Sequence, residues 1–176
     1  MLKNACTVLG LLMVAALPFG CAQNDPDAPE IGGYSTGLVV SNLTAIPDVV
    51  QQGSGELVTL RFEVRNRDFE PFPGRNIAFY RLGFDVPLDP TTTYYVCTGD
   101  IGIITISSDI TDANGLAFGE FRTGDAEFST DPTCLAPPPF KVQIFRTFIE
   151  GKITDPREGE EEAQISDEVA MEHYNP

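Results

Sequence analysis

Residues 56–65 read ELVTLRFEVR and carry the clearest periodic signal in the chain. Apolar and polar residues alternate strictly from Val58 to Arg65. The apolar set is Val58, Leu60, Phe62 and Val64, and the polar set is Thr59, Arg61, Glu63 and Arg65. Successive side chains of a β-strand point to opposite faces of its sheet. The stretch therefore predicts a strand with one face in a core and the other in solvent.

Similar short runs lie on both sides of this strand. We expect strands at Leu38–Ala45, Arg75–Leu82, Thr93–Thr98, Gly102–Ser107, Leu116–Thr123, Phe140–Glu150 and Asp167–Tyr174. Turn residues, such as the glycines of 53–55 and the prolines of 137–139, separate the runs too often for long helices. The pattern predicts an all-β sandwich of about seven to eight antiparallel strands.

The first 20 residues differ from the rest and read as an export signal. Lys3 supplies a positive start, and residues 5–17 form an uncharged apolar run shorter than the roughly 20 residues that span a bilayer. The run ends in LPFGC at 17–21, which resembles the bacterial lipobox. This resemblance implies a lipoprotein signal peptide at 1–20 and lipid attachment at Cys21. Ordinary cleavage nearby, with Cys21 left as a free thiol or removed, is the alternative.

The residues after Cys21 fit a tether between a lipid anchor and a folded domain. Residues 21–33 are polar and contain proline and glycine, as a flexible linker does. In Gram-negative lipoproteins an Asp after the acylated cysteine marks the inner membrane, so Ala22 implies the outer membrane by resemblance. We expect a cell-envelope protein that contacts the membrane only through its lipid anchor, with one domain at 34–176.

The net charge limits the classes of binding partner, and the cysteine content indicates a disulfide. The chain has a formal net charge of −15, which disfavours nucleic acid and anionic lipid headgroups as partners. Of its four cysteines, Cys6 lies in the signal and Cys21 is assigned to the lipid. Because exported chains favour disulfides, we expect Cys97 to pair with Cys134.

Residues 111–117, TDANGLA, resemble the recurrent T-D-x-x-G-x-A hairpin of bacterial immunoglobulin-like domains of the invasin and intimin type. PGRNIAF at 73–79 and SDEVAM at 166–171 resemble other strands of that family, whereas residues 69–72 depart from its turn. The likeness covers most of 38–174, with 83–100 and 125–139 as insertions. It implies an immunoglobulin-like sandwich with a role in surface recognition or adhesion, and it places the two cysteines at one end of the sandwich.

Candidate catalytic, metal and cofactor sites are weak. Asp109, Asp112 and Asn114 invite a calcium site, but Ile110 interrupts the spacing of an EF-hand loop, which favours a hairpin turn. The acidic run at 158–162 reads as a solvated loop. His173, the one histidine, is expected on the surface of the last strand, and no nucleophile motif accompanies it. We therefore expect that the protein is not an enzyme and that it binds neither a metal ion nor a cofactor.

Four aromatic residues in turn-rich stretches are the candidates for contact with a partner: Phe69, Phe72, Tyr94 and Tyr95. They serve equally well to close the ends of a sandwich. The leading hypothesis is recognition of a protein or glycan of the cell surface or envelope. Its alternatives are an accessory subunit of an envelope or secretion complex and a carbohydrate-binding module.

Overall fold

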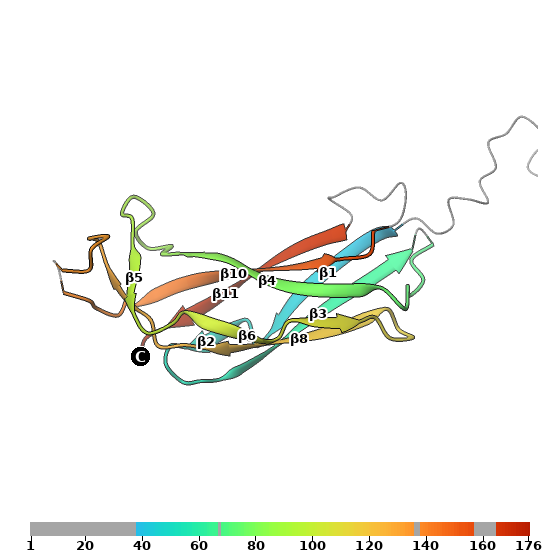
Figure 1. Cartoon of the computed structure of the whole chain (residues 1–176), viewed down its shortest axis with the longest axis horizontal. Helices are drawn as coiled ribbons and strands as arrows, with labels where there is room; N and C mark the ends of the chain where they lie inside the picture. The colour runs from blue at the N-terminus through green and yellow to red at the C-terminus, as the bar shows by residue number, and fades with distance from the viewer. Residues whose placement is uncertain (1–37, 67, 136–137, 157–164) are drawn as a thin grey trace, which may run out of the picture. The chain divides into compact units, whose positions relative to one another are not determined.

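The computed structural model describes residues 38–66, 68–135, 138–156 and 165–176, and it shows an all-β fold (Figure 1). The strands are β1 (Leu38–Ile46), β2 (Val49–Gln51), β3 (Leu57–Asn66), β4 (Asn76–Asp85), β5 (Tyr95–Thr98), β6 (Gly102–Ile106), β7 (Ser108–Ile110), β8 (Leu116–Thr123), β9 (Glu127–Ser129), β10 (Ile144–Ile153) and β11 (Ser166–Tyr174). In this described part, no helix is long and apolar enough to cross a membrane.

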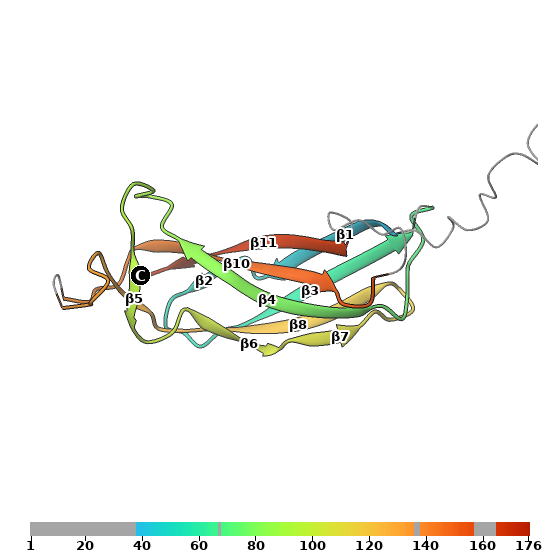
Figure 2. The same ribbon diagram turned by 45° about the horizontal axis from the view of Figure 1, so that its top comes forward.

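Two sheets pack face to face (Figure 2). The first has the strand order β1-β3-β8-β6, and the second has the order β2-β11-β10-β4-β7. Neighbouring strands are antiparallel except for β2 and β11, which run parallel. The orders match the two sheets of an immunoglobulin fold. The predicted immunoglobulin-like β-sandwich is confirmed.

The chain switches from the first sheet to the second at both lateral edges of the sandwich. After β1 it passes through the cis Ile46–Pro47 peptide into β2, and after β6 it passes through Ser107 into β7. Edge groups are paired at these switches: the Phe79 amide donates to the Ser107 carbonyl at 2.9 Å, and the Leu43 amide donates to the Asp167 carboxylate at 2.7 Å. Such pairing reduces the exposed hydrogen-bonding edge.

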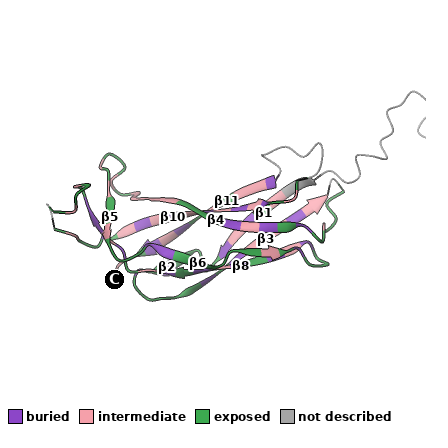
Figure 3. Ribbon diagram, viewed as in Figure 1, coloured by how far each residue is buried: buried purple, intermediate pink, exposed green. Residues whose placement is uncertain are grey.

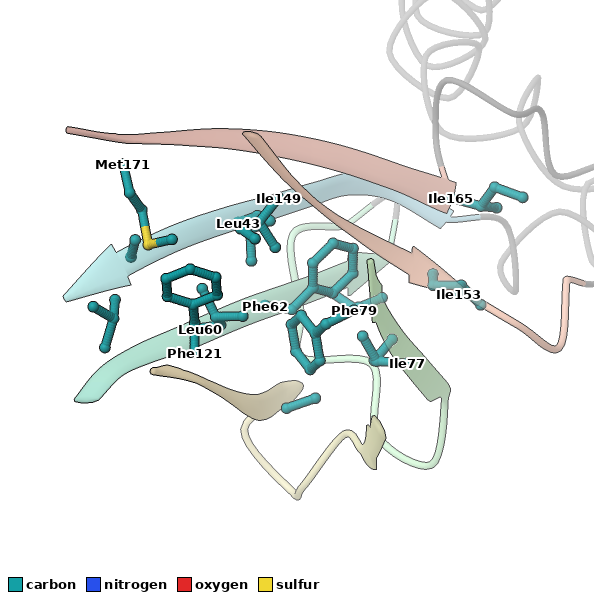
Figure 4. Close-up of a cluster of buried hydrophobic side chains, with 14 of the residues drawn as sticks. Leu43, Leu60, Phe62, Ile77, Phe79, Phe121, Ile149, Ile153, Ile165 and Met171 are labelled. Carbon is teal, nitrogen blue, oxygen red and sulfur yellow. The ribbon is translucent and has the colours of Figure 1, made fainter. Parts of the chain in front are cut away.

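The main core lies between the two sheets (Figure 4). The four apolar residues that alternate between Val58 and Arg65, namely Val58, Leu60, Phe62 and Val64, are all fully buried, as predicted. Glycines in the opposite sheet make room for the larger rings. A Cβ atom at Gly151 would lie 2.4 Å from the Phe62 ring, so the packing of this ring depends on the missing side chain.

Strand boundaries differ from the prediction where segments are short or shared. The strand expected at Phe140–Glu150 begins only at Ile144, because Phe140 pairs instead with Phe128 through two backbone hydrogen bonds of 2.6 and 2.9 Å. The strands β2, β7 and β9 were not predicted. Each has three residues, which is too few for an alternating pattern to be recognised.

The prediction that His173 lies on the surface is wrong. It is fully buried between the sheets, with its ring stacked on Phe145 at 4.3 Å and edge-on to Phe121 at 6.1 Å. Neither ring nitrogen has a hydrogen-bond partner, and burial lowers the pKa of His173 to about 4. The alternation of Met171 and His173 along β11 was the signal that pointed inward.

Candidate functional site

The two ends of the sandwich differ, because only one of them has an additional small sheet. At one end β1 begins at Leu38, which pairs with Asn66 at the end of β3. At the other end the small sheet β5–β9 extends beyond the two main sheets, and Figures 1 and 2 both show it opposite the start of β1. We call this extension the tip and define it as residues 86–98, 127–135 and 138–143.

Two glycines allow the tip to join the sandwich. A Cβ atom at Gly99 would lie 2.0 Å from the carbonyl oxygen of Asp125, and one at Gly124 would lie 1.9 Å from that of Asp100. Gly99 also has a φ of 70°, in the region that favours glycine. The segments that enter and leave the tip therefore cross in backbone contact, which no other residue type permits.

A disulfide fixes the outer part of the tip. Cys97 in β5 bonds to Cys134, which follows β9, and their Cα atoms are 5.5 Å apart. The predicted pairing is thus confirmed. The bond links residues 37 positions apart and holds together the two stretches that the sequence marked as insertions.

A second, smaller core lies where the tip meets the sandwich. Its buried members are Phe128 and Val142 of the tip and Ile101, Ala126 and Phe145 of the adjoining segments, with Phe84, Val86 and Tyr94 packed against them. The Phe128 ring lies 5.2 Å from both Phe84 and Phe145, in tilted geometry. This packing gives the tip a fixed shape on which surface groups are held.

Apolar side chains remain exposed on the tip, where Figure 3 shows a large exposed share. They are Leu88, Tyr95, Val96, Leu135 and Phe140. Leu135 is 83% exposed and Leu88 is 67% exposed. Val96 and Phe140 both lie opposite Phe128, and Leu88 and Phe140 line the same hollow. Exposed apolar side chains at such a place are candidates for contact with a partner.

Two hollows lie beside these residues and share one wall, formed by Val86, Asp89 and Tyr94. The larger has a volume of about 370 Å³ and is also lined by Phe84, Asp85 and Thr92. The smaller, of about 270 Å³, is lined further by Leu88, Phe140 and residues 141–144.

Hydroxyl groups surround the carboxylate in the shared wall. Tyr94 donates its phenolic proton to Asp89 at 3.0 Å, and Thr91 donates to the same carboxylate at 3.1 Å. Hydrogen bonds from Thr92 and Tyr94 lower the pKa of Asp89, while burial and the Asp89 contact raise the pKa of Tyr94. Asp89 is therefore ionised and Tyr94 protonated at neutral pH.

The four aromatic residues predicted as partner contacts are divided between the two ends. Tyr94 and Tyr95 belong to the tip, with Tyr94 half-buried in the hollow and Tyr95 exposed on β5. Phe69 and Phe72 lie in the turn between β3 and β4 at the opposite end. Phe69 is exposed with a φ of 60°, whereas Phe72 packs against the core beneath the Arg75 guanidinium.

The hairpin at 111–117 forms as the turn hypothesis expects. The Asp112 carboxylate accepts backbone hydrogen bonds from Asn114 at 2.8 Å and Leu116 at 3.0 Å, and these bonds lower its pKa. Gly115, with a φ of 74°, supplies the left-handed position. Within the described ranges, no group of His, Cys, Asp and Glu side chains is arranged to hold a metal ion.

Several predicted features lie outside the described residues. They are the signal peptide at 1–20, the lipid attachment site Cys21, the tether at 21–33 and the acidic run at 158–162. Conversely, sequence reasoning missed Leu88, Asp89, Leu135 and Phe140. Asp89 lies within Pro87-Leu88-Asp89-Pro90, and an apolar residue inside such a turn-rich stretch was the available signal.

The chain shows similarity to known proteins in its three-dimensional structure only. No protein-family model and no curated protein matches the chain. Among solved structures it is similar to the Yersinia pseudotuberculosis adhesin InvE, with a TM-score of 0.47 and 12% identity, and to the D00-D0 domain of intimin, with a TM-score of 0.44 and 11% identity. A third is WR4, an MSP family member of C. elegans, with a TM-score of 0.36 and 11% identity.

Each alignment covers 76% of this chain. It covers 31% of the adhesin chain, 48% of the intimin chain and 97% of the C. elegans chain. An adhesin and a domain of intimin are thus among the solved structures to which the chain is similar.

Proposed function

We propose that the chain is a non-catalytic recognition module of the bacterial cell surface or envelope, that it is anchored in the outer membrane through Cys21, and that the tip is its contact surface. The observation that carries the proposal is the position of the tip. It projects from the end of the sandwich opposite the residue at which the N-terminal segment enters the fold. The tip is therefore the end of the sandwich remote from the point at which an N-terminal anchor would be attached.

The build of the tip supports the same role. A disulfide, a second, smaller core at its base and two glycine crossings hold a surface whose apolar side chains are left in solvent. Exposed apolar groups do not stabilise the sandwich itself. Their presence on a rigid extension is explained by a partner that covers them.

Site-specific photocrosslinking in intact cells tests the contact surface. One variant carries p-benzoylphenylalanine in place of Tyr95, and the matched variant carries it in place of Phe69, so that both exchanges are aromatic for aromatic at exposed sites. We expect an adduct of defined mass from position 95 and none from position 69. Adducts from position 69 alone, or from neither position, would refute the tip as the contact surface.

Anchoring is tested separately by the intact mass of the mature protein. We expect a chain that begins at Cys21 with added acyl groups, found in the outer-membrane fraction, and a soluble form from Cys21→Ser. A mature chain with an unmodified N-terminus would disprove the lipid anchor without affecting the tip assignment.

A further inference from the structure

Asp89 differs from the neighbouring carboxylates in how its charge is balanced. Asp85 forms a two-point ion pair with Arg146, with Nε to Oδ1 at 2.9 Å, and Asp125 is paired with Lys141. Asp89 accepts hydrogen bonds from side-chain hydroxyls and from the backbone of Thr92, and no cation pairs with it among the ion pairs of the described residues. Of the two carboxylates in the hollows, one is therefore neutralised and the other presents a net negative charge.

The surroundings of Asp89 combine this charge with apolar surface. Tyr94 and Val86 stand beside it on the wall that divides the hollows, and Phe84 and Phe140 contribute rings to the two sides. A lysine or arginine side chain has a matching structure, because an apolar stem carries a charged head. The head would reach the carboxylate while the stem packs on the Tyr94 ring.

We propose that the hollows on either side of Asp89 bind a lysine or arginine side chain, flanked by apolar residues, from a segment of a partner protein. This inference rests on the proposed function and names the class of partner that the tip receives. The exposed Leu88 and Leu135 would cover the apolar flanks of the segment. The net charge of −15 would speed the approach of a basic partner.

A peptide titration followed by NMR tests the proposal on the ¹⁵N-labelled chain 22–176 with its disulfide intact. The probes are acetyl-Leu-Arg-Leu-amide and the same peptide with citrulline, the neutral isostere of arginine. We expect the amides of Thr92 and Thr93 to shift with the arginine peptide and the citrulline peptide to bind roughly tenfold more weakly. Added salt should reduce this preference.

Two matched variants localise the charge. Asp89→Asn removes the charge but keeps an oxygen that accepts the Tyr94 hydroxyl, so we expect it to abolish the preference for arginine over citrulline. Asp68→Asn makes the same change at an exposed site at the opposite end of the sandwich and should leave the preference intact. Equal binding of both peptides, or an arginine preference that survives Asp89→Asn, would overturn the proposal.

The outcomes separate this inference from the function on which it rests. Equal binding of both peptides by the natural protein, together with crosslinking at position 95, would disprove the cation site and leave the recognition module. An arginine preference that depends on Asp89, without crosslinking in cells, would support the cation site and disprove the tip as the contact surface. Shifts of the Thr92 and Thr93 amides with maltotriose, and none with either peptide, would assign the hollows to a glycan and overturn the protein-segment proposal.

Discussion

Burial of His173 predicts that the folded protein loses stability in mild acid. The imidazole packs against Phe145 and Phe121 without a hydrogen-bond partner, and burial lowers its pKa from 6.5 to about 4. As pH falls through 6.5, the unfolded chain binds a proton at this residue, whereas the folded chain does not until pH is near 4. The free energy of unfolding therefore decreases across this window and is fully retained above it.

The size of the effect follows from the two pKa values. One pKa unit corresponds to about 1.4 kcal/mol, so His173 lowers the free energy of unfolding by about 2 kcal/mol at pH 5 relative to pH 7.5. The full loss at and below pH 4 is about 3 kcal/mol. Domains of this kind have total stabilities of roughly 5–15 kcal/mol, so the change is readily measured.

Urea unfolding at pH 7.5 and pH 5.0 provides the assay. His173→Phe keeps an aromatic ring against Phe145 but does not titrate, so its free energy of unfolding should lack the component of about 2 kcal/mol that the natural protein loses between these pH values. Thr147→Val is the matched control. It changes another fully buried residue, whose hydroxyl has no hydrogen-bond partner, without changing a titratable group.

The three carboxylates with lowered pKa values do not obscure this window. Asp89, Asp100 and Asp112 give stability that is lost only as pH falls to about 3.8 and below, under the lower pH of the assay. An equal loss between pH 7.5 and 5.0 in the natural protein and in His173→Phe would refute the reasoning. The same loss in Thr147→Val as in the natural protein is expected.

Two further predictions concern the stability of the sandwich and the tip. Replacing Cys97 and Cys134 together with serine should lower the free energy of unfolding by about 4 kcal/mol in the loop-entropy model, measured by urea unfolding, and a reductant should then affect only the natural protein. Gly151→Ala should destabilise by about 1–3 kcal/mol because its Cβ would meet the Phe62 ring. Gly83→Ala, with open space around the added carbon, should change the melting temperature little, and equal losses from both glycine variants would contradict the packing argument.

Local patterns were sufficient for the strands of the two main sheets. The alternation in 58–65 predicted which side chains of β3 are buried, and Leu116–Thr123 was predicted with the boundaries that β8 has. Asp112 and Gly115 closed their hairpin as expected, because a turn depends on the few residues within it. These features are local, so the information for them lies in adjacent residues.

The candidate site was less accessible to prediction. The sequence marked 83–100 and 125–139 as insertions and paired Cys97 with Cys134, but it did not indicate that the insertions form one sheet. Asp89 has no motif around it. Its charge stands out only because Asp85 and Asp125 have cations beside them, and those cations come from distant parts of the chain.

The amino-acid sequence alone predicted the all-β class, the acidic charge and the Cys97–Cys134 pairing, and its resemblance to bacterial immunoglobulin-like domains implied the type of sandwich. The first three follow from period-two alternation, from composition and from the number of cysteines. Tertiary structure alone decided that His173 is buried, that Tyr94 and Phe69 lie at opposite ends, and that Asp89 is an uncompensated charge between two hollows. Such properties arise from contacts between residues far apart in the chain, and a linear pattern carries no record of them.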